Sequence, residues 1–241
     1  MNKRVQAFKE GKRIKTIPIP FKTFVDIDVT FDGKIVLLDN LVKKSVYILD
    51  SEGKTLNIIP LEGRQIPYGP AVTAIMCVRE GKFPGIWAEV EDRSVRIAML
   101  DGTTTERIGA PGIFSWDGRR LMQAQKIGDA TASIQISKKD SASLWNDPIN
   151  IFLDRYIVHL LGLWDDRYGR VFLGAYLENG EPSNTMIVIT PEGKELGRVK
   201  LFFQNLPHEI YHSVRVSTEG HIYQMALDKG GVFIRRYEIL E

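Results

Sequence analysis

The sequence has a single cysteine, Cys77, inside the apolar run AVTAIMCV. One cysteine excludes an internal disulfide, and its apolar neighbours predict a buried structural thiol. No apolar run approaches the ~18 residues that a membrane-spanning helix needs, and the N-terminal stretch MNKRVQAFKEGKRIK lacks the hydrophobic core of a signal peptide. We therefore expect no membrane span. The compartment stays open, and it would be extracytoplasmic if a signal peptide had been trimmed.

A large excess of charge is also missing. The formal net charge is +2, with 44% hydrophobic and 26% charged residues, which is typical of a folded globular protein and excludes disorder. The near-neutral balance argues against a nucleic-acid partner. The first fifteen residues are locally basic, but their alternation with Val5, Phe8 and Ile14 indicates solvated strand faces.

Helical patterning is absent as well. Apolar residues alternate with polar ones or form short β-branched runs, and glycine or proline interrupts every longer stretch. The sequence therefore predicts an all-β fold.

The sequence instead contains a repeat built on glycine turns. Acidic-glycine turns between β-patterned runs predict tight hairpins, because glycine accepts the positive φ that such turns require. One kind of hairpin has its turn at Glu10-Gly11-Lys12, Glu52-Gly53-Lys54, Glu192-Gly193-Lys194 and Asp101-Gly102. A second kind precedes the first and occupies residues 26–39, 75–90, 112–125, 161–176 and 214–227. Each unit thus supplies strands A and B followed by strands C and D. Four short antiparallel strands that recur every ~40–50 residues are typical of β-propeller blades.

Counting strands along the chain leaves two blade numbers open. Residues 126–156 are the least regular, and we interpret them as strands C and D of the third blade plus a longer connection. The chain begins with a C–D pair and ends with an A–B–C set. We therefore predict a single β-propeller domain over residues 1–241, with five or six four-stranded antiparallel blades. We expect the N-terminal strands to complete the last blade and close the ring.

Residues 24–57, FVDIDVTFDGKIVLLDNLVKKSVYILDSEGKTL, resemble the NHL-type propeller repeat. Asp32-Gly33, Asp39, Val46, Asp50 and Gly53-Lys54 occupy the characteristic places of that repeat. The resemblance implies a ring of blades around a channel. It does not imply a particular chemistry, since such rings include both binding proteins and enzymes.

The stretch His208-Glu209-Ile210-Tyr211-His212 is a literal H-E-x-x-H, the zinc-binding signature of a class of metalloproteases. That chemistry requires both histidines on one face of a helix. Pro207 precedes the motif and the β-run SVRV follows it, so no helix of useful length fits. The sequence therefore argues against a zinc protease, and we predict no metal site.

A looser role for the same residues remains. Residues 203–213 would link strand D of one blade to strand A of the next, and such loops gather at the channel mouth, where propellers bind ligands. We therefore predict that His208, Glu209, Tyr211 and His212 face a ligand. The alternative is that His212 caps a strand and His208 is solvated.

We assign two more connections to the same face of the ring. Leu61–Pro70 contributes Arg64 and Tyr68, and Leu144–Tyr156 contributes Trp145, Arg155 and Tyr156. Aromatic and arginine side chains in loops suit partner contacts, because they bury much area with few rotors or form paired hydrogen bonds. The alternative is that each packs over a blade edge.

Signatures of catalysis are lacking. The sequence contains no G-x-S-x-G and no glycine-rich phosphate loop, and we interpret Asp165-Asp166 as turn residues. We therefore expect a non-enzymatic binding or scaffold propeller without a cofactor, which presents a loop-lined face to a protein or carbohydrate partner. The alternative is a propeller lyase, lactonase or hydrolase with His208, Glu209 and His212 at the channel mouth.

Overall fold

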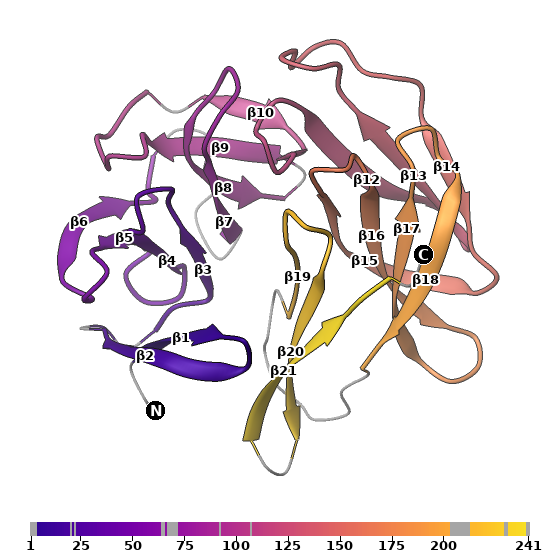
Figure 1. Ribbon diagram of the computed structural model, residues 1–241. Coiled ribbons are helices and arrows are strands. Elements are labelled where there is room, and N and C mark those ends of the chain that lie inside the picture. The colour runs from indigo at the N-terminus through magenta and orange to yellow at the C-terminus, as the bar shows by residue number, and fades with distance from the viewer. Residues whose placement is uncertain are drawn as a thin grey trace. The chain divides into compact units, whose positions relative to one another are not determined.

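The computed structural model describes residues 4–19, 21, 23–63, 66, 72–91, 93–106, 108–202, 213–228 and 231–239. By its internal contacts the chain divides into two compact units, Met1–Ala110 and Pro111–Glu241, and each is described by itself. The described residues contain only strands, turns and loops (Figure 1). The predicted all-β class is therefore confirmed.

The first unit begins with a hairpin and continues with two blades whose strands lie side by side in chain order (Figure 1). The hairpin consists of β1 (Arg4–Lys9) and β2 (Lys12–Pro18). The first blade consists of β3 (Asp26–Val29), β4 (Ile35–Asp39), β5 (Ser45–Leu49) and β6 (Thr55–Pro60). The second blade consists of β7 (Val72–Val78), β8 (Gly85–Val90), β9 (Arg93–Ala98) and β10 (Gly109–Pro111), which runs across the boundary between the units.

The second unit contains three more blades in the same antiparallel order. The third blade consists of β11 (Ile113–Phe114), β12 (Leu121–Gly128), β13 (Thr131–Ile136) and β14 (Ile149–Phe152). The fourth consists of β15 (Tyr156–Asp165), β16 (Val171–Glu178), β17 (Ser183–Ile189) and β18 (Glu195–Leu201). The last consists of β19 (Val214–Val216), β20 (Ile222–Asp228) and β21 (Gly231–Tyr237).

The fold class is thus a β-propeller with antiparallel blades, and the described residues form five of them. Four blades hold all four strands in one sheet, and the described part of the last blade holds three. The terminal strands are present as predicted, with a two-stranded sheet at the N-terminus and a three-stranded sheet at the C-terminus. Closure of the last blade by the N-terminal strands, within a single domain, stays a prediction.

The glycines that marked the repeat in the sequence form the turns of the structure. In the turns between strands A and B, Gly33, Gly118, Gly169 and Gly220 have φ values of 82°, 68°, 80° and 79°. This left-handed region is strained for residues with a Cβ. The first residue of each turn also accepts a backbone hydrogen bond from the fifth or sixth, as from Lys34 to the Thr30 hydroxyl at 3.0 Å. The turns are therefore set by local chemistry and recur wherever the pattern recurs.

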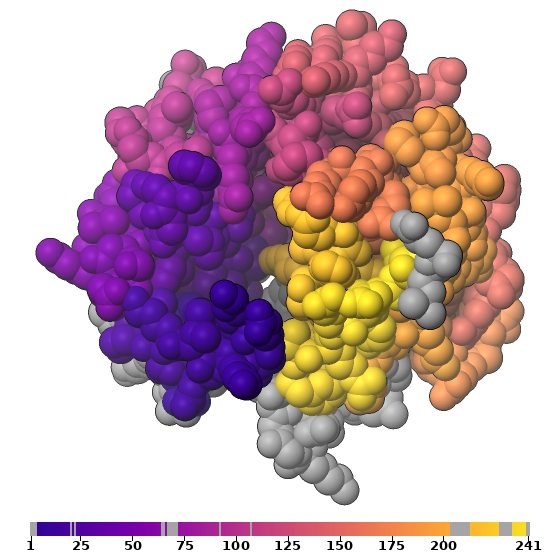
Figure 2. All heavy atoms as spheres, in the orientation of Figure 1, coloured from indigo at the N-terminus to yellow at the C-terminus, as the bar shows by residue number. Residues whose placement is uncertain are grey.

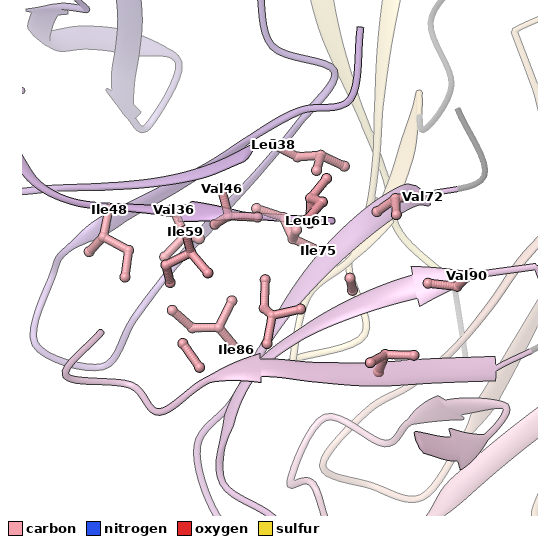
Figure 3. Packing of buried hydrophobic residues seen from close by; sticks show 14 residues of the cluster. Val36, Leu38, Val46, Ile48, Ile59, Leu61, Val72, Ile75, Ile86 and Val90 are labelled. Atoms are coloured by element: carbon pink, nitrogen blue, oxygen red, sulfur yellow. The ribbon is translucent and has the colours of Figure 1, made fainter. Parts of the chain in front are cut away.

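Hydrophobic layers join neighbouring blades within each unit. In the first unit, Val36, Val46 and Ile48 from the first blade point toward Ile75 and Ile86 of the second, and all five are buried (Figure 3). A matching layer joins the third and fourth blades, and a smaller one joins the fourth blade to the last. Burial of each such side chain stabilises the fold by about 1.5–3 kcal/mol.

The N-terminal hairpin packs against the first blade (Figure 2). Ile17 and Ile19 are buried in a cluster with Leu37 and Leu49. Gly53 lies at this contact with φ 88°, and a Cβ there would come within 2.7 Å of Cγ2 of Ile17. The hairpin is therefore in close contact with the turn between β5 and β6.

Carboxylates add polar links between neighbouring blades. Asp26 and Asp28 of β3 accept the backbone N–H groups of Ile75 at 2.9 Å and Cys77 at 2.7 Å. In the second unit Asp165 accepts the N–H of Trp116 at 2.7 Å. Each pair is 49 residues apart in the sequence, so the links follow the length of the blade repeat.

Candidate functional site

Only part of the predicted ligand-binding set lies within the described residues. Trp145, Arg155 and Tyr156 are described. The others lie outside the described residues, and their roles stay predictions: Arg64, Tyr68, His208, Glu209, Tyr211 and His212.

The expectation that residues 144–156 form one loop on one face is wrong. Strand β14 interrupts this stretch, and its register places the two ends far apart. Trp145 forms a bridge with Ser137, just beyond the end of β13. Tyr156 follows Phe152, which pairs with Thr131 at the start of β13. Trp145 therefore lies at one end of the third blade, and Arg155 and Tyr156 lie at the other.

The connection that carries Arg155 and Tyr156 is fixed by backbone hydrogen bonds. It links β14 to β15 and runs beside the turn between β12 and β13. Leu153 donates its N–H to the carbonyl of Ala130 at 2.8 Å, and Ile157 donates to the carbonyl of Asp129 at 2.7 Å. The backbone on both sides of Tyr156 is thus held against the third blade.

The guanidinium of Arg155 forms hydrogen bonds to residues of the fourth blade. Its Nη1 donates to Oγ of Ser183 at 2.9 Å, and its Nη2 donates to the carbonyl of Glu181. These contacts anchor the β14–β15 connection to the loop between β16 and β17. Arg155 therefore acts as a support for this surface, which is the packing alternative that the sequence left open.

Tyr156 is the exposed residue of the pair, with a relative exposure of 42%. The Nζ of Lys126, on β12, lies 3.9 Å from the centre of its ring. The same ammonium donates to the carbonyl of Ile157 at 2.6 Å. This cation–π contact holds the ring in place and covers one of its faces.

Two further rings lie along the same strands. His159 of β15 and Tyr176 of β16 are paired across the sheet, with ring centroids 5.2 Å apart. The hydroxyl of Tyr176 donates to Oε1 of Glu178 at 2.8 Å, and this hydrogen bond raises the pKa of Tyr176. We refer to the group of Lys126, Arg155, Tyr156, His159 and Tyr176 as the Tyr156 surface.

Charged side chains surround the Tyr156 surface in pairs of opposite sign. Asp154 pairs with Arg198 at 2.9 Å, and Glu181 pairs with Lys200 at 3.3 Å. Exposed pairs of this kind contribute little to stability, about 0–1 kcal/mol each. Their pairing leaves no strong excess of one sign beside the aromatic residues.

Two observations on the described residues concern metal binding and the single thiol. None of them form a group of three or more His, Cys, Asp or Glu side chains placed to hold a metal ion. Burial and the neighbouring Asp28 carboxylate raise the pKa of the Cys77 thiol, which keeps it protonated and a poor nucleophile. No helix in the described part of the chain is long and apolar enough to span a bilayer.

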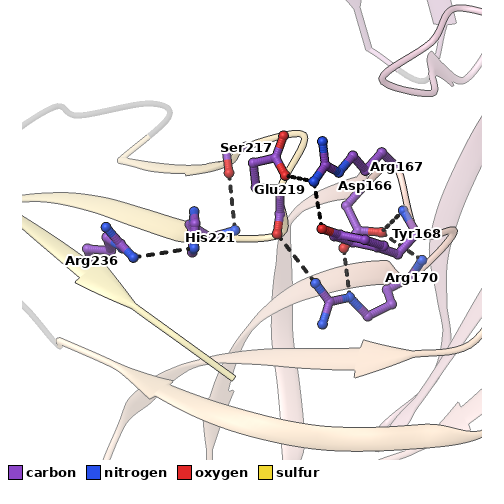
Figure 4. Close-up of polar contacts among 8 residues, drawn as sticks. All are labelled: Asp166, Arg167, Tyr168, Arg170, Ser217, Glu219, His221 and Arg236. Carbon is purple, nitrogen blue, oxygen red and sulfur yellow. Dashed lines mark hydrogen bonds and ion pairs between the residues drawn. The ribbon is translucent and has the colours of Figure 1, made fainter. Parts of the chain in front are cut away.

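Asp165 and Asp166 stand at the far end of β15 and have different partners. Asp166 accepts the N–H groups of Tyr168 at 3.0 Å and Arg170 at 2.9 Å, and pairs with Nε of Arg170 at 2.7 Å (Figure 4). Asp166 is thus a turn residue, as the sequence indicated. Asp165 instead reaches the third blade, and burial raises its pKa to about 7.

Sequence reasoning missed Lys126, His159 and Tyr176. All three lie in strands of the structure, where alternation alone does not distinguish a binding residue from an ordinary outward-facing one. The break in the alternation of β15 was an available signal, because bulges at Ile157/His159 and Leu160/Gly162 change which side chains face outward.

Comparisons with known proteins support the fold alone. No protein-family model and no curated protein matches the sequence. Hsv2 of Kluyveromyces lactis is similar with a TM-score of 0.56 and 11% identity, over 98% of this chain and 92% of that one. The periplasmic gluconolactonase PpgL of Pseudomonas aeruginosa has a TM-score of 0.46 and 12% identity, over 95% and 72% of the two chains. Hsv2 of Kluyveromyces marxianus has a TM-score of 0.47 and 12% identity. The match includes 95% of this chain and 64% of that longer chain, which is less than two thirds of its length. The first likeness shows a shared fold, and the TM-scores of the other two carry no argument.

Proposed function

We propose that this protein is a non-enzymatic binding propeller that contacts a protein partner through the Tyr156 surface. The observation that carries the proposal is the exposed ring of Tyr156, held by Lys126 at 3.9 Å on a connection that backbone hydrogen bonds fix in place. A large exposed side chain that is already ordered loses little entropy when a partner covers it.

The composition of the surface fits a protein interface. Tyrosine, tryptophan and arginine dominate the residues that carry most binding energy between proteins, and charged residues form the rim around them. Here Tyr156, His159 and Tyr176 supply the rings, and the Asp154–Arg198 pair supplies part of the rim. A protein partner suits this arrangement better than a polyanion, because the surrounding charges are balanced.

A carbohydrate is the other partner class suggested by the sequence. A sugar that stacks on tyrosine needs an open ring face, and Lys126 covers one face of Tyr156. The second face of the ring stays open to a sugar, so the preference for a protein partner comes from the arginine and the charged pairs around the rings. The enzyme alternative depends on His208, Glu209 and His212, which lie outside the described residues, and no observation on the described part favours it.

The test compares wild type with Tyr156→Ala and His159→Ala in affinity capture from native extract. Captured proteins are then purified and their affinity is measured by isothermal titration calorimetry. A central tyrosine contributes about 2 kcal/mol or more to such an interface, so we expect Tyr156→Ala to weaken binding by at least ~10-fold. Phe31→Ala is the matched control, because Phe31 is an exposed aromatic on another blade, with an exposure of 83%.

The outcomes separate the alternatives. A verified partner that loses affinity for Tyr156→Ala, and keeps it for Phe31→Ala, supports the proposal. A partner that binds all four proteins equally contradicts it. Binding to a glycan array that is lost in Tyr156→Ala replaces the protein partner with a carbohydrate.

A further inference from the structure

The opposite end of the third and fourth blades carries a second exposed surface with different chemistry. We name it the turn ridge and define it by Trp116, Arg120, Lys138, Lys139, Leu144 and Tyr168. Strand β15 runs from Tyr156 to Asp165, ten residues, which at ~3.3 Å per residue separates the two ends by about 30 Å. We propose that the turn ridge binds an acidic, partly apolar peptide segment of a partner protein.

The first part of the ridge is the turn between β11 and β12, which hydrogen bonds hold rigid. Ser115 donates its hydroxyl to Asp117 at 2.6 Å and accepts the N–H of Arg120 at 3.0 Å. Asp117 also accepts the N–H of Arg119 at 3.0 Å. Trp116 projects from this turn with an exposure of 45%.

The second part is the loop between β13 and β14, which is tied to that turn. Asp140 donates its N–H to the carbonyl of Arg119 at 2.6 Å. Within the loop, Lys138 donates its N–H to the carbonyl of Leu144 at 2.7 Å. The loop therefore has a defined shape, and it presents Leu144 with an exposure of 57% together with Lys138 and Lys139, both exposed.

The third part is the turn between β15 and β16. The Asp165–Trp116 hydrogen bond joins it to the first turn at 2.7 Å. The ring of Tyr168, exposed at 60%, has the guanidinium carbons of Arg167 at 5.0 Å and Arg170 at 5.2 Å from its centre (Figure 4). These contacts and the Asp166–Arg170 pair hold Tyr168 in place.

Turn formation does not demand an exposed tryptophan. The same kind of turn has Phe31, Arg167 or Thr218 at the place that Trp116 occupies. One exposed apolar side chain on a turn, such as Phe31, is ordinary. Trp116 differs because the Asp140–Arg119 hydrogen bond ties its turn to the loop that presents Leu144 and the two lysines, and such a combined patch points to an interaction.

The charges of the ridge select the partner. Three of the acidic groups are used internally, since Asp117 caps its own turn, Asp165 bridges two blades and Asp166 pairs with Arg170. Asp140 is exposed beside Lys139 in the same loop and offsets part of the positive charge of the two lysines. Lys138 and Lys139 have no ion pair within the part of the chain that the structure describes. Exposed cations beside Trp116 and Leu144 fit a segment that carries Asp or Glu next to an apolar residue.

The experiment selects random 12-residue displayed peptides on the immobilised full chain. We expect the enriched peptides to carry acidic residues flanking a large apolar one. Synthetic peptides should then lose at least ~10-fold in affinity toward Trp116→Ser, and the double change Lys138→Glu, Lys139→Glu should do the same, with weaker binding at higher salt. The matched control is Phe31→Ser, which removes an aromatic from an equivalent turn of the first blade.

The remaining outcomes each overturn the proposal. Enrichment without acidic residues does so, and so does binding that Trp116→Ser and the double lysine variant leave unchanged. Vesicles of phosphatidylcholine with phosphatidylserine and a duplex DNA are included as parallel probes. If either binds in a Trp116-dependent way and no acidic peptide is enriched, the ridge recognises a lipid surface or a nucleic acid instead. Circular dichroism of each variant is measured in parallel, and we expect the spectrum of wild type because the changes are at exposed positions.

Discussion

Asp165 is a buried carboxyl whose ionisation should set the pH dependence of stability. It has a relative exposure of 9% and lies between two blades, where it accepts the N–H of Trp116. Burial is the largest cause of its raised pKa, about 7 against an ordinary 3.8, and the nearby Asp117 and Asp166 carboxylates raise it further. The hydrogen bond from Trp116 and the charge of Arg120 act in the opposite direction.

The sign and size of the effect follow from proton linkage. The folded chain holds this proton up to about pH 7, whereas the unfolded chain releases it near 3.8. The contribution of Asp165 to stability is therefore fully present below pH 3.8 and is lost as the pH rises through 7. A difference of about 3 pKa units corresponds to about 4 kcal/mol, on the order of one third or more of the stability of a typical domain.

The substitution Asp165→Asn isolates this contribution. The asparagine amide keeps an oxygen for the N–H of Trp116 and cannot ionise. We expect the two proteins to have similar free energies of unfolding at pH 4, and the variant to be more stable by about 4 kcal/mol at pH 8. The assay is urea unfolding at unit steps of pH between 4 and 8, followed by circular dichroism.

The control is Asp101→Asn. Asp101 is exposed and its pKa is lowered, chiefly by the N–H of Thr103, so its contribution is lost only in acid, as the pH falls through that lowered pKa. The free energy of unfolding of the control should therefore differ from that of wild type by a constant amount between pH 5 and 8. If the difference in free energy of unfolding between Asp165→Asn and wild type is also constant across this range, Asp165 is ionised in the folded protein and the reasoning from burial is refuted.

Two matched pairs of substitutions test the packing described above by urea unfolding. Gly33→Ala and Gly53→Ala both place a Cβ at positive φ, which costs about 1–2 kcal/mol, but only at Gly53 would the Cβ clash with neighbouring atoms. We therefore expect a larger loss of unfolding free energy for Gly53→Ala. Equal losses for the two variants would contradict close packing of the hairpin. Arg170→Met leaves the fully buried carboxylate of Asp166 without its ion pair and should lower the free energy of unfolding by about 3 kcal/mol, whereas Arg167→Met removes an exposed pair and should change it by less than ~1 kcal/mol. Similar losses for the two arginines would show that Asp166 does not depend on the pair.

The sequence predicted the blades because their turns are local. A glycine after an acidic or aromatic residue marks each turn between strands A and B, and the positive φ that it needs depends on nothing distant. The third blade was harder, because β14 is only four residues long and follows a loop of residues 137–148. Its run INIF lay inside a stretch that we assigned to a surface loop, and that error placed Trp145 beside Tyr156.

The Tyr156 surface could be predicted only in part, for a geometric reason. Tyr156 stands out as an aromatic residue next to a connection. Its partner Lys126 lies 30 residues earlier on another blade, and the contact depends on how the two sheets pack. Patterns along one strand show which side a residue takes, but they carry no information on which residue of the next sheet it meets.

Asp165 and Asp166 show the same limit within two adjacent residues. The rule that neighbours on a strand face opposite ways correctly separates them. The partner of Asp166 could also be anticipated, because Arg170 is four residues away and closes the same turn. The partner of Asp165 is a backbone N–H 49 residues earlier, and the burial that raises its pKa exists only once the two blades have packed. Two adjacent carboxyls thus have different environments, because one has a partner within its own turn and the other has a partner in a neighbouring blade.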